Sequence, residues 1–350
     1  MKCPACAFDQ KYKGGMVCGS CGYRFALDPK KAPHVTDMAF KKAVDRLSML
    51  GEYHFTHNQL FAQIHRLILK KRRSARIGGM IALAVLGIIL YFLGVRNLIG
   101  EGLPGAILFG VPWLLFVVHR WRSPVKIPHE QVNGLIRTYQ AAHPMEPLVT
   151  GRAFDGLDRE EIDAEFLRYA PERIVVVERD DLADMLLLNR FHFENKALVV
   201  SASKYPRRAF AACRAFLDRH PDLPVFLFHD ASRKGHRMKT DLLADPAWNL
   251  AGKTVKDLGL NPYDVERLRS PLWIPDPGGK TKGKYVRIGG KPIENIEDGY
   301  MLPVDIGAPR SAMGALSLAA GAGLVLASPE LLAQQAVDAR GGGGLGGGFG

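Results

Sequence analysis

The spacing of apolar positions changes along the chain, and each change predicts a different kind of element. Apolar residues recur at helical spacing over residues 34–69, where Thr56 is the expected N-cap of a helix that begins at His57. Two further stretches with helical spacing, 130–142 and 158–169, come later. The first half of the chain is therefore expected to contribute mainly helices.

Short, wholly apolar runs follow in the second half of the chain. They are separated by segments of helical period and occupy residues 174–177, 197–200 and 225–228. Uniform runs of this length are typical of buried parallel strands joined by crossover helices. The pattern therefore predicts a Rossmann-like α/β domain over residues 171–307, with a short strand near Val255 and a hairpin turning at Gly289 and Gly290.

Two long stretches without charged residues, 77–95 and 103–118, lie between the helical and the α/β parts. The first has the roughly 20 residues that a membrane-spanning helix needs. Basic clusters flank both outer ends, so the positive-inside rule predicts a transmembrane hairpin with both flanking parts in the cytoplasm. The alternative is a helical hairpin buried in protein. We expect a multi-pass protein of the cell membrane, with the lipid bilayer as a partner and residues 311–329 as a candidate third span.

These patterns together predict a multidomain α/β membrane protein. Its expected segments are a cysteine-bearing module, a helical segment, a transmembrane hairpin, a linker with helices, an α/β domain and an Ala/Gly-rich end with a flexible tail. In that order they cover residues 1–27, 28–75, 76–121, 122–170, 171–307 and 308–350.

Charge alone does not identify a partner. The 350 residues include 47 Lys and Arg against 35 Asp and Glu, a formal net charge of +12. Such a balance fits nucleic acid, anionic lipid or positive-inside topology. The basic run 70–73 abuts the first uncharged stretch, which favours the membrane explanation over nucleic acid.

Four of the five cysteines form two paired motifs at the N-terminus. Cys3 and Cys6 are followed, after eleven residues, by Cys18 and Cys21. Each C-x2-C turn delivers two sulfurs, and four thiolates suit the tetrahedral preference of zinc. The module resembles the zinc-ribbon family, which implies a structural zinc. The fifth cysteine, Cys213, falls in the apolar pattern of a helix and is expected in the core.

Acidic residues follow two of the predicted strands. Glu178 ends the first run and Asp230 follows the third. The carboxyl ends of parallel strands meet at one edge, where ligands and metals bind. These carboxylates are therefore candidate catalytic residues and candidate ligands of a magnesium ion.

The segment 174–235 resembles the Toprim domain, in the version found in type IIB DNA topoisomerase A subunits. Members carry a glutamate after the first strand and an Asp-x-Asp pair after a later one, which together hold magnesium. Glu178 matches the glutamate and Asp230 the first aspartate, and the opening of a helix at Tyr205 and Pro206 also fits. Gly235, the phrase at 189–192 and the segment 258–268 complete the resemblance.

The chain departs from that family at two places. Ser232 stands where the resemblance expects the second aspartate, so one carboxylate is missing, and Asp181 is left as an outer candidate. The family also needs a tyrosine nucleophile, but Phe61 and Ala62 occupy the nearest matching positions. Neither can form a phosphotyrosyl bond, so a strand-passing topoisomerase is not expected.

Simpler interpretations stand beside each candidate. The strand-end acids can serve only to cap the next helices, a role that suits Asp180 and Asp181. The histidines His54, His57 and His65 are expected at the surface or in packing. The sequence Gly-Gly-Lys-Thr at 278–281 echoes a phosphate loop but lacks its upstream glycine, and is expected to be an ordinary loop.

The sequence leads to one expected function and one alternative. We expect a membrane-anchored zinc-ribbon protein whose degenerate Toprim-like domain binds or scaffolds nucleic acid or a protein partner. The alternative is a magnesium-dependent nuclease or phosphotransfer enzyme that uses Glu178 and Asp230. The sequence leaves open whether the chain is an enzyme.

Overall fold

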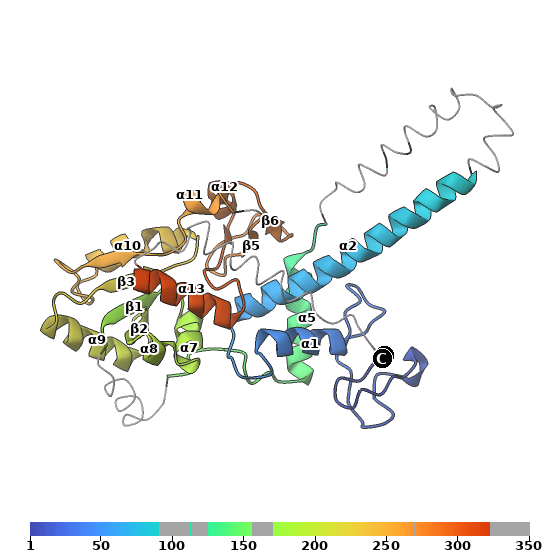
Figure 1. The fold of residues 1–350 in the computed structure, drawn as a ribbon, viewed down its shortest axis with the longest axis horizontal. Helices are drawn as coiled ribbons and strands as arrows, with labels where there is room; N and C mark the ends of the chain where they lie inside the picture. Colours follow the sequence, from blue (N-terminus) through green and yellow to red (C-terminus); the bar gives the residue numbers. More distant parts are fainter. Residues whose placement is uncertain (91–112, 114–115, 117–124, 156–170, 269, 323–350) are drawn as a thin grey trace. The chain divides into compact units, whose positions relative to one another are not determined.

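The computed structural model describes residues 1–90, 125–155, 171–268 and 270–322, together with Trp113 and Phe116 (Figure 1). The chain forms two compact units. One comprises Met1–Ile64 and Pro128–Gly350, and the other is His65–Ile127. The features described below belong to the first unit unless stated otherwise.

Helices organise the N-terminal part of this unit. A short 3-10 helix η1 (Tyr12–Gly14) precedes α1 (Asp37–Leu47), α2 (His57–Leu90) and α5 (His129–Ala142). Helix α2 begins at the predicted residue. The Thr56 hydroxyl accepts from the amide of Gln59 at 3.3 Å, and the Gln59 side chain accepts from the amide of Thr56 at 2.9 Å. This reciprocal pair is a capping box, and the predicted cap at Thr56 is confirmed.

A parallel sheet forms the centre of the unit. Its strands are β1 (Arg173–Val177), β2 (Ala197–Ser201), β3 (Val225–Phe228) and β4 (Val255–Asp257), in the order β2-β1-β3-β4. All neighbouring pairs run parallel, as predicted. The connecting helices are α7 (Asp180–Leu188), α8 (Phe191–Glu194), α9 (Arg207–Arg219) and α10 (Arg233–Ala244).

The strand order fixes where a site can form. From β1 the chain crosses to β2 on one side, and from β3 it crosses to β4 on the other. Adjacent strands whose connections leave in opposite directions open a crevice beyond their carboxyl ends, and ligands of α/β sheets bind in such crevices. The residues after β1 and β3 therefore occupy the position at which this fold class places its sites.

A small antiparallel sheet follows. It has the order β6-β5-β7, from β5 (Leu272–Pro275), β6 (Arg287–Ile288) and β7 (Tyr300–Met301), and is accompanied by α11 (Pro262–Val265) and α12 (Pro292–Glu297). The hairpin predicted at Gly289 and Gly290 is absent. Strand β6 pairs antiparallel with β5, the strand that precedes it in the chain. The two glycines after β6 lead into α12, because Pro292 starts a helix and no returning strand follows.

The last described helix, α13 (Pro309–Ala322), is part of the core. Ala315, Ala319 and Ala320, with Leu316, pack in the same cluster as the buried strand residues of the parallel sheet. Figure 1 shows this red helix lying across the strands. Small side chains allow close approach of the helix backbone, which accounts for the Ala-rich composition of this segment.

The prediction of a multi-pass membrane protein is wrong. Within the parts of the chain that the structure describes, no helix has the length and apolar character that crossing a bilayer requires. The described uncharged end of α2, residues 77–90, is shorter than the roughly 20 residues a span needs. The described part of the candidate third span places Met313, Leu316 and Ala320 in the core, and residues 323–329 lie outside the described residues. Apart from Trp113 and Phe116, the second predicted span, 103–118, lies outside the described residues.

Candidate functional site

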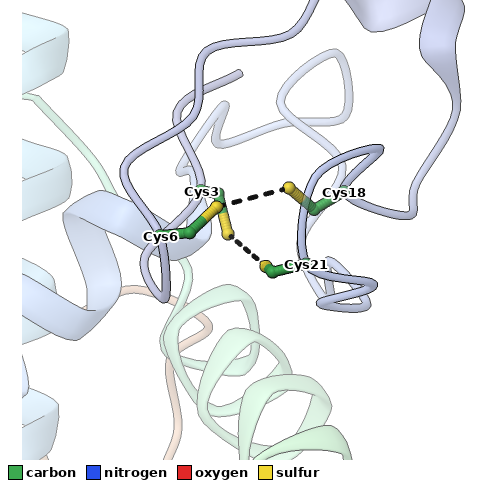
Figure 2. A group of neighbouring side chains, drawn as sticks. All are labelled: Cys3, Cys6, Cys18 and Cys21. Atoms are coloured by element: carbon green, nitrogen blue, oxygen red, sulfur yellow. Dashed lines mark hydrogen bonds between the residues drawn. The ribbon is translucent and has the colours of Figure 1, made fainter.

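Four cysteines gather their sulfurs in one place at the N-terminus (Figure 2). Their Sγ atoms all lie within 4.8 Å of one another. The Sγ atoms of Cys3 and Cys21 are 3.6 Å apart, and those of Cys6 and Cys18 are 3.7 Å apart. A tetrahedral zinc ion with Zn–S bonds of about 2.3 Å would hold its sulfurs about 3.8 Å apart. The cysteines therefore lie close enough to hold a metal ion such as zinc.

The two cysteine turns share one backbone pattern. In each, the amide of the first cysteine donates to the carbonyl five residues on, and the amide four residues on donates back to the cysteine carbonyl. The residue after each second cysteine is left-handed, with φ 61° at Ala7 and 74° at Gly22. In the first turn the amide of Phe8 lowers the pKa of Cys6 to about 7, whereas the pKa of Cys21 is raised, because the amide of Tyr23 is outweighed by the hydrogen bond to Cys6 and by burial.

Exchanging the residue types at these equivalent positions should change metal affinity in opposite directions. A left-handed alanine costs roughly 1–2 kcal/mol, and the metal affinity of such a module is also its folding energy. Gly22→Ala should therefore weaken zinc binding about tenfold, whereas Ala7→Gly should leave it equal or tighter. Competition with a chromophoric zinc chelator measures both affinities. Weaker binding by the Ala7→Gly protein would contradict the equivalence of the turns.

The cysteine module is fixed to the helices behind it. The ring of Tyr23 stacks on His143 at the end of α5, with centroids 4.5 Å apart and planes 8° from parallel. The buried carboxylate of Asp37 accepts from the amides of Ala26 and Leu27, both at 2.8 Å. The Tyr23 hydroxyl donates to the same carboxylate at 3.1 Å. The module is therefore joined to α1 and α5 by specific contacts.

Glu178 and Asp230 lie side by side at the carboxyl ends of β1 and β3. The amide of Asp230 donates to Oε2 of Glu178 at 2.9 Å. The hydroxyl of Ser232 donates to Oε1 of Glu178 at 2.9 Å and accepts from the amide of Gly235 at 2.8 Å, so it also caps α10. A Cβ on Gly235 would lie 2.1 Å from the carbonyl oxygen of Asp230, so this position has room only for glycine. Both Glu178 oxygens thus bind donors of the protein itself.

A guanidinium group supplies the positive charge of this site. Nε of Arg179 lies 2.8 Å from Asp230, one Nη lies 2.7 Å from Asp181, and the other is paired with Asp305. The carboxylates of Asp230 and Asp305 have no solvent exposure, and Arg179 itself is only 16% exposed. The three aspartates therefore direct oxygens at an arginine, where a magnesium site would direct them at a metal ion.

The remaining aspartate oxygens are also bound. The amide of Val304 donates to the second oxygen of Asp230 at 2.8 Å, and the hydroxyl of Thr56 donates to that of Asp305 at 2.6 Å. Thr56 also caps α2, so the network joins the start of that helix to the sheet edge. A metal ion at Asp230 would have to displace these bonds.

His229 is a buried imidazole beside the carboxylates. Its Nδ1 faces the carbonyl oxygen of Asp230 at 2.9 Å, and its Nε2 faces a carboxylate oxygen of Asp257 at 3.0 Å. Because both ring nitrogens face acceptor atoms, this arrangement favours the doubly protonated, positively charged form of the ring. Burial alone would lower the pKa of His229, but the bonds to Asp257 and to the Asp230 carbonyl raise it.

The carboxylates together exceed the charge of Arg179. Burial raises the pKa of Asp230 to about 7 despite the attraction of Arg179, and the negative charges of Glu178 and Asp305 act in the same direction as burial. Burial likewise raises the pKa of Asp181. The cluster therefore takes up a proton near neutral pH.

This proton uptake should make the site's contribution to stability fall as the pH rises. Folded Asp230 keeps a proton that the unfolded chain loses near pH 4, so its contribution to the free energy of unfolding decreases up to about pH 7, by at most about 1.4 kcal/mol per pH unit. The raised pKa of His229 extends the decrease above pH 6.5. The free energy of unfolding, measured with urea across this range, should depend less on pH for Asp230→Asn than for the unchanged protein. Equal slopes would contradict the assignment.

The acids at the start of α7 do not act as caps. Asp180 and Asp181 lie in its first turn, but no side chain caps the helix. Asp180 accepts from the hydroxyls of Ser201 and Ser203, each at 2.5 Å, and Asp181 pairs with Arg179. The capping interpretation therefore places these acids correctly but assigns them the wrong bonds.

The other sequence candidates do not assemble into a site. Phe61 and Ala62, at the positions where the resemblance expects tyrosines, are buried core residues. His54 is half-buried and His57 is exposed. In the second unit, His65 is buried, which lowers its pKa to about 4. These histidines belong to packing and surface, as expected.

Three residues of the site were not identified from the sequence. Arg179 adjoins Glu178 but lies in a charged run typical of a helix start. Asp305 is far along the chain from Asp230, and no motif connects the two. For His229 a signal existed, because it ends the third apolar run directly before Asp230.

Beyond the four cysteines, the described residues contain no group of three or more His, Cys, Asp or Glu whose ligand atoms converge for a metal. Magnesium at Glu178 and Asp230 therefore has no support. The chain matches no protein-family model, no curated protein and no solved structure.

Proposed function

We propose that this chain is a zinc-ribbon protein whose Toprim-like domain binds or scaffolds a partner without using a catalytic metal. The resemblance of the segment 174–235 to the Toprim domain, and the parallel order β2-β1-β3-β4, support the family of the domain. The absence of a second aspartate at Ser232 supports the loss of its chemistry.

The pairing of Arg179 with Asp181, Asp230 and Asp305 carries this proposal. A magnesium site needs free carboxylate oxygens in near-octahedral positions, and water or phosphate in the others. Here a fixed side-chain cation already pairs with the three aspartates, and Glu178 is held by Ser232 and a backbone amide. This arrangement favours binding over metal-dependent phosphodiester cleavage.

Zinc has a structural part in the proposal. Cys3, Cys6, Cys18 and Cys21 would complete the coordination sphere and leave no open position for water or substrate. The ion would hold the module against α1 and α5, where Tyr23 and Asp37 anchor it. It would contribute folding energy rather than catalysis.

A cleavage assay separates this proposal from the enzymatic alternative. Supercoiled plasmid DNA and single-stranded RNA are incubated with the zinc-loaded chain and Mg²⁺ or Mn²⁺. We expect no metal-dependent cleavage, and equal background for the unchanged chain and Glu178→Gln. Cleavage by the unchanged chain that disappears in a folded Glu178→Gln protein would overturn the proposal.

A further inference from the structure

A basic face lies beside the carboxylate site. Helix α10 begins directly after Ser232, the residue that donates to Glu178, and the loop 278–284 contacts the same helix. A Cβ on Gly278 would lie only 3.2 Å from the ammonium nitrogen of Lys234. The term basic face refers here to the exposed cations of these two segments, which are Arg233, Lys234, Arg237, Lys280, Lys282 and Lys284.

The loop presents its lysines on a fixed backbone. The hydroxyl of Thr281 donates to the carbonyl of Gly299 at 3.0 Å. A Cβ on Gly283 would lie 2.4 Å from the hydroxyl of Tyr300, so this residue packs closely against β7. Thr281 and Gly283 face inward and alternate in the sequence with Lys280, Lys282 and Lys284, so the three lysines face solvent.

The cations of α10 oppose the helix dipole. Arg233 and Lys234 occupy its first turn, which contains no acidic residue. A cation at a helix N-terminus is unfavourable, whereas an anion there is stabilising. An external anion bound over this turn would compensate the unfavourable placement.

Three members of the basic face have no nearby counter-charge. In the part of the chain that the structure describes, no carboxylate oxygen lies within 4 Å of the ammonium groups of Lys234, Lys280 or Lys284. The other members make exposed ion pairs or a bond to a backbone carbonyl. The face therefore keeps a net positive charge.

We propose that the basic face binds the phosphate backbone of nucleic acid. The cations are spread over a helix and a loop, which suits the repeated charges of a polyanion better than one small anion. Each phosphate contact releases counterions, so binding should weaken steeply with salt. This inference rests on the proposed binding function and names the partner, whose contacts would lie next to the carboxylates that Arg179 holds.

Fluorescence anisotropy with short DNA and RNA strands and duplexes tests the proposal on the full, zinc-loaded chain. The test variant is Lys280→Gln with Lys284→Gln. The matched control, Arg207→Gln with Arg219→Gln, removes the same charge from exposed positions on α9. We expect the test variant to bind about tenfold more weakly, with a log–log salt slope smaller by about 2, and the control to bind like the unchanged protein.

Each outcome decides a separate question. If the unchanged chain binds and only the test variant is weakened, the basic face is the contact surface. If both variants bind alike, the basic face is excluded while nucleic-acid binding stands. If the unchanged chain binds no nucleic acid, this inference fails, and the metal-independent binding function then requires a protein partner. The cleavage assay judges that function independently.

Discussion

Replacing Cys18 and Cys21 by serine should abolish zinc binding and unfold residues 1–27 while leaving the parallel sheet intact. Zinc contributes roughly 10–16 kcal/mol of apparent binding energy in modules of this kind, and here the cysteine cluster has few packing partners of its own. The loss should extend to the contacts of Asp37, because its donors, Ala26 and Leu27, belong to the module.

Hydrogen exchange followed by mass spectrometry, together with zinc analysis, checks this result. The amides of Cys3, Cys18 and Leu27, which are bonded in the structure, should lose protection, and those of β1 should keep it. Cys213→Ala is the matched control. Its sulfur is buried in α9, where burial raises the pKa of the thiol, so zinc content should not change. Full zinc content in the double serine variant would disprove the cysteine site.

Replacing Arg179 by methionine should cost about 3–5 kcal/mol of the free energy of unfolding. Removing one partner of a buried ion pair leaves uncompensated charge in a medium that solvates it poorly. Here two fully buried carboxylates, those of Asp230 and Asp305, lose their cation together. A loss of this size is a large part of the stability of an ordinary domain.

The control for this change is Arg152→Met. Arg152 pairs with Asp180 at 2.8 Å but is 45% exposed, so solvent screens this pair and the same substitution should cost much less stability than Arg179→Met. Adding Asp305→Asn to Arg179→Met should recover part of the loss, because one unpaired charge is then removed. Urea unfolding measures all these variants. Equal losses for the two methionine variants would show that Arg179 is not the buried counter-ion.

The elements that could be predicted are those that local pattern determines. The strands carry uniform apolar runs because both faces of a covered parallel sheet are buried. The capping box at Thr56 lies within four consecutive residues. The cysteine cluster follows from spacing, since each C-x2-C turn closes on its own backbone. The neighbouring positions of Glu178 and Asp230 follow from the sheet rule.

The features that could not be predicted depend on contacts between distant segments. Asp305 reaches Arg179 only after the chain has passed through α12 and β7, and no spacing rule connects them. The composition of 311–322 fits a packing helix as well as a weak membrane span, because Ala and Gly suit both. Only the burial of its residues against the sheet distinguishes the two.

The central claim is that a side-chain cation, and not a divalent metal, pairs with the buried aspartates beside the carboxyl ends of β1 and β3. Titrating the zinc-loaded chain with Mn²⁺ while recording the electron paramagnetic resonance signal of the free ion tests it most directly. We predict that the signal grows as it does in buffer, and that Asp230→Asn changes nothing. Binding of one Mn²⁺ per chain that is lost in both Glu178→Gln and Asp230→Asn would contradict the claim.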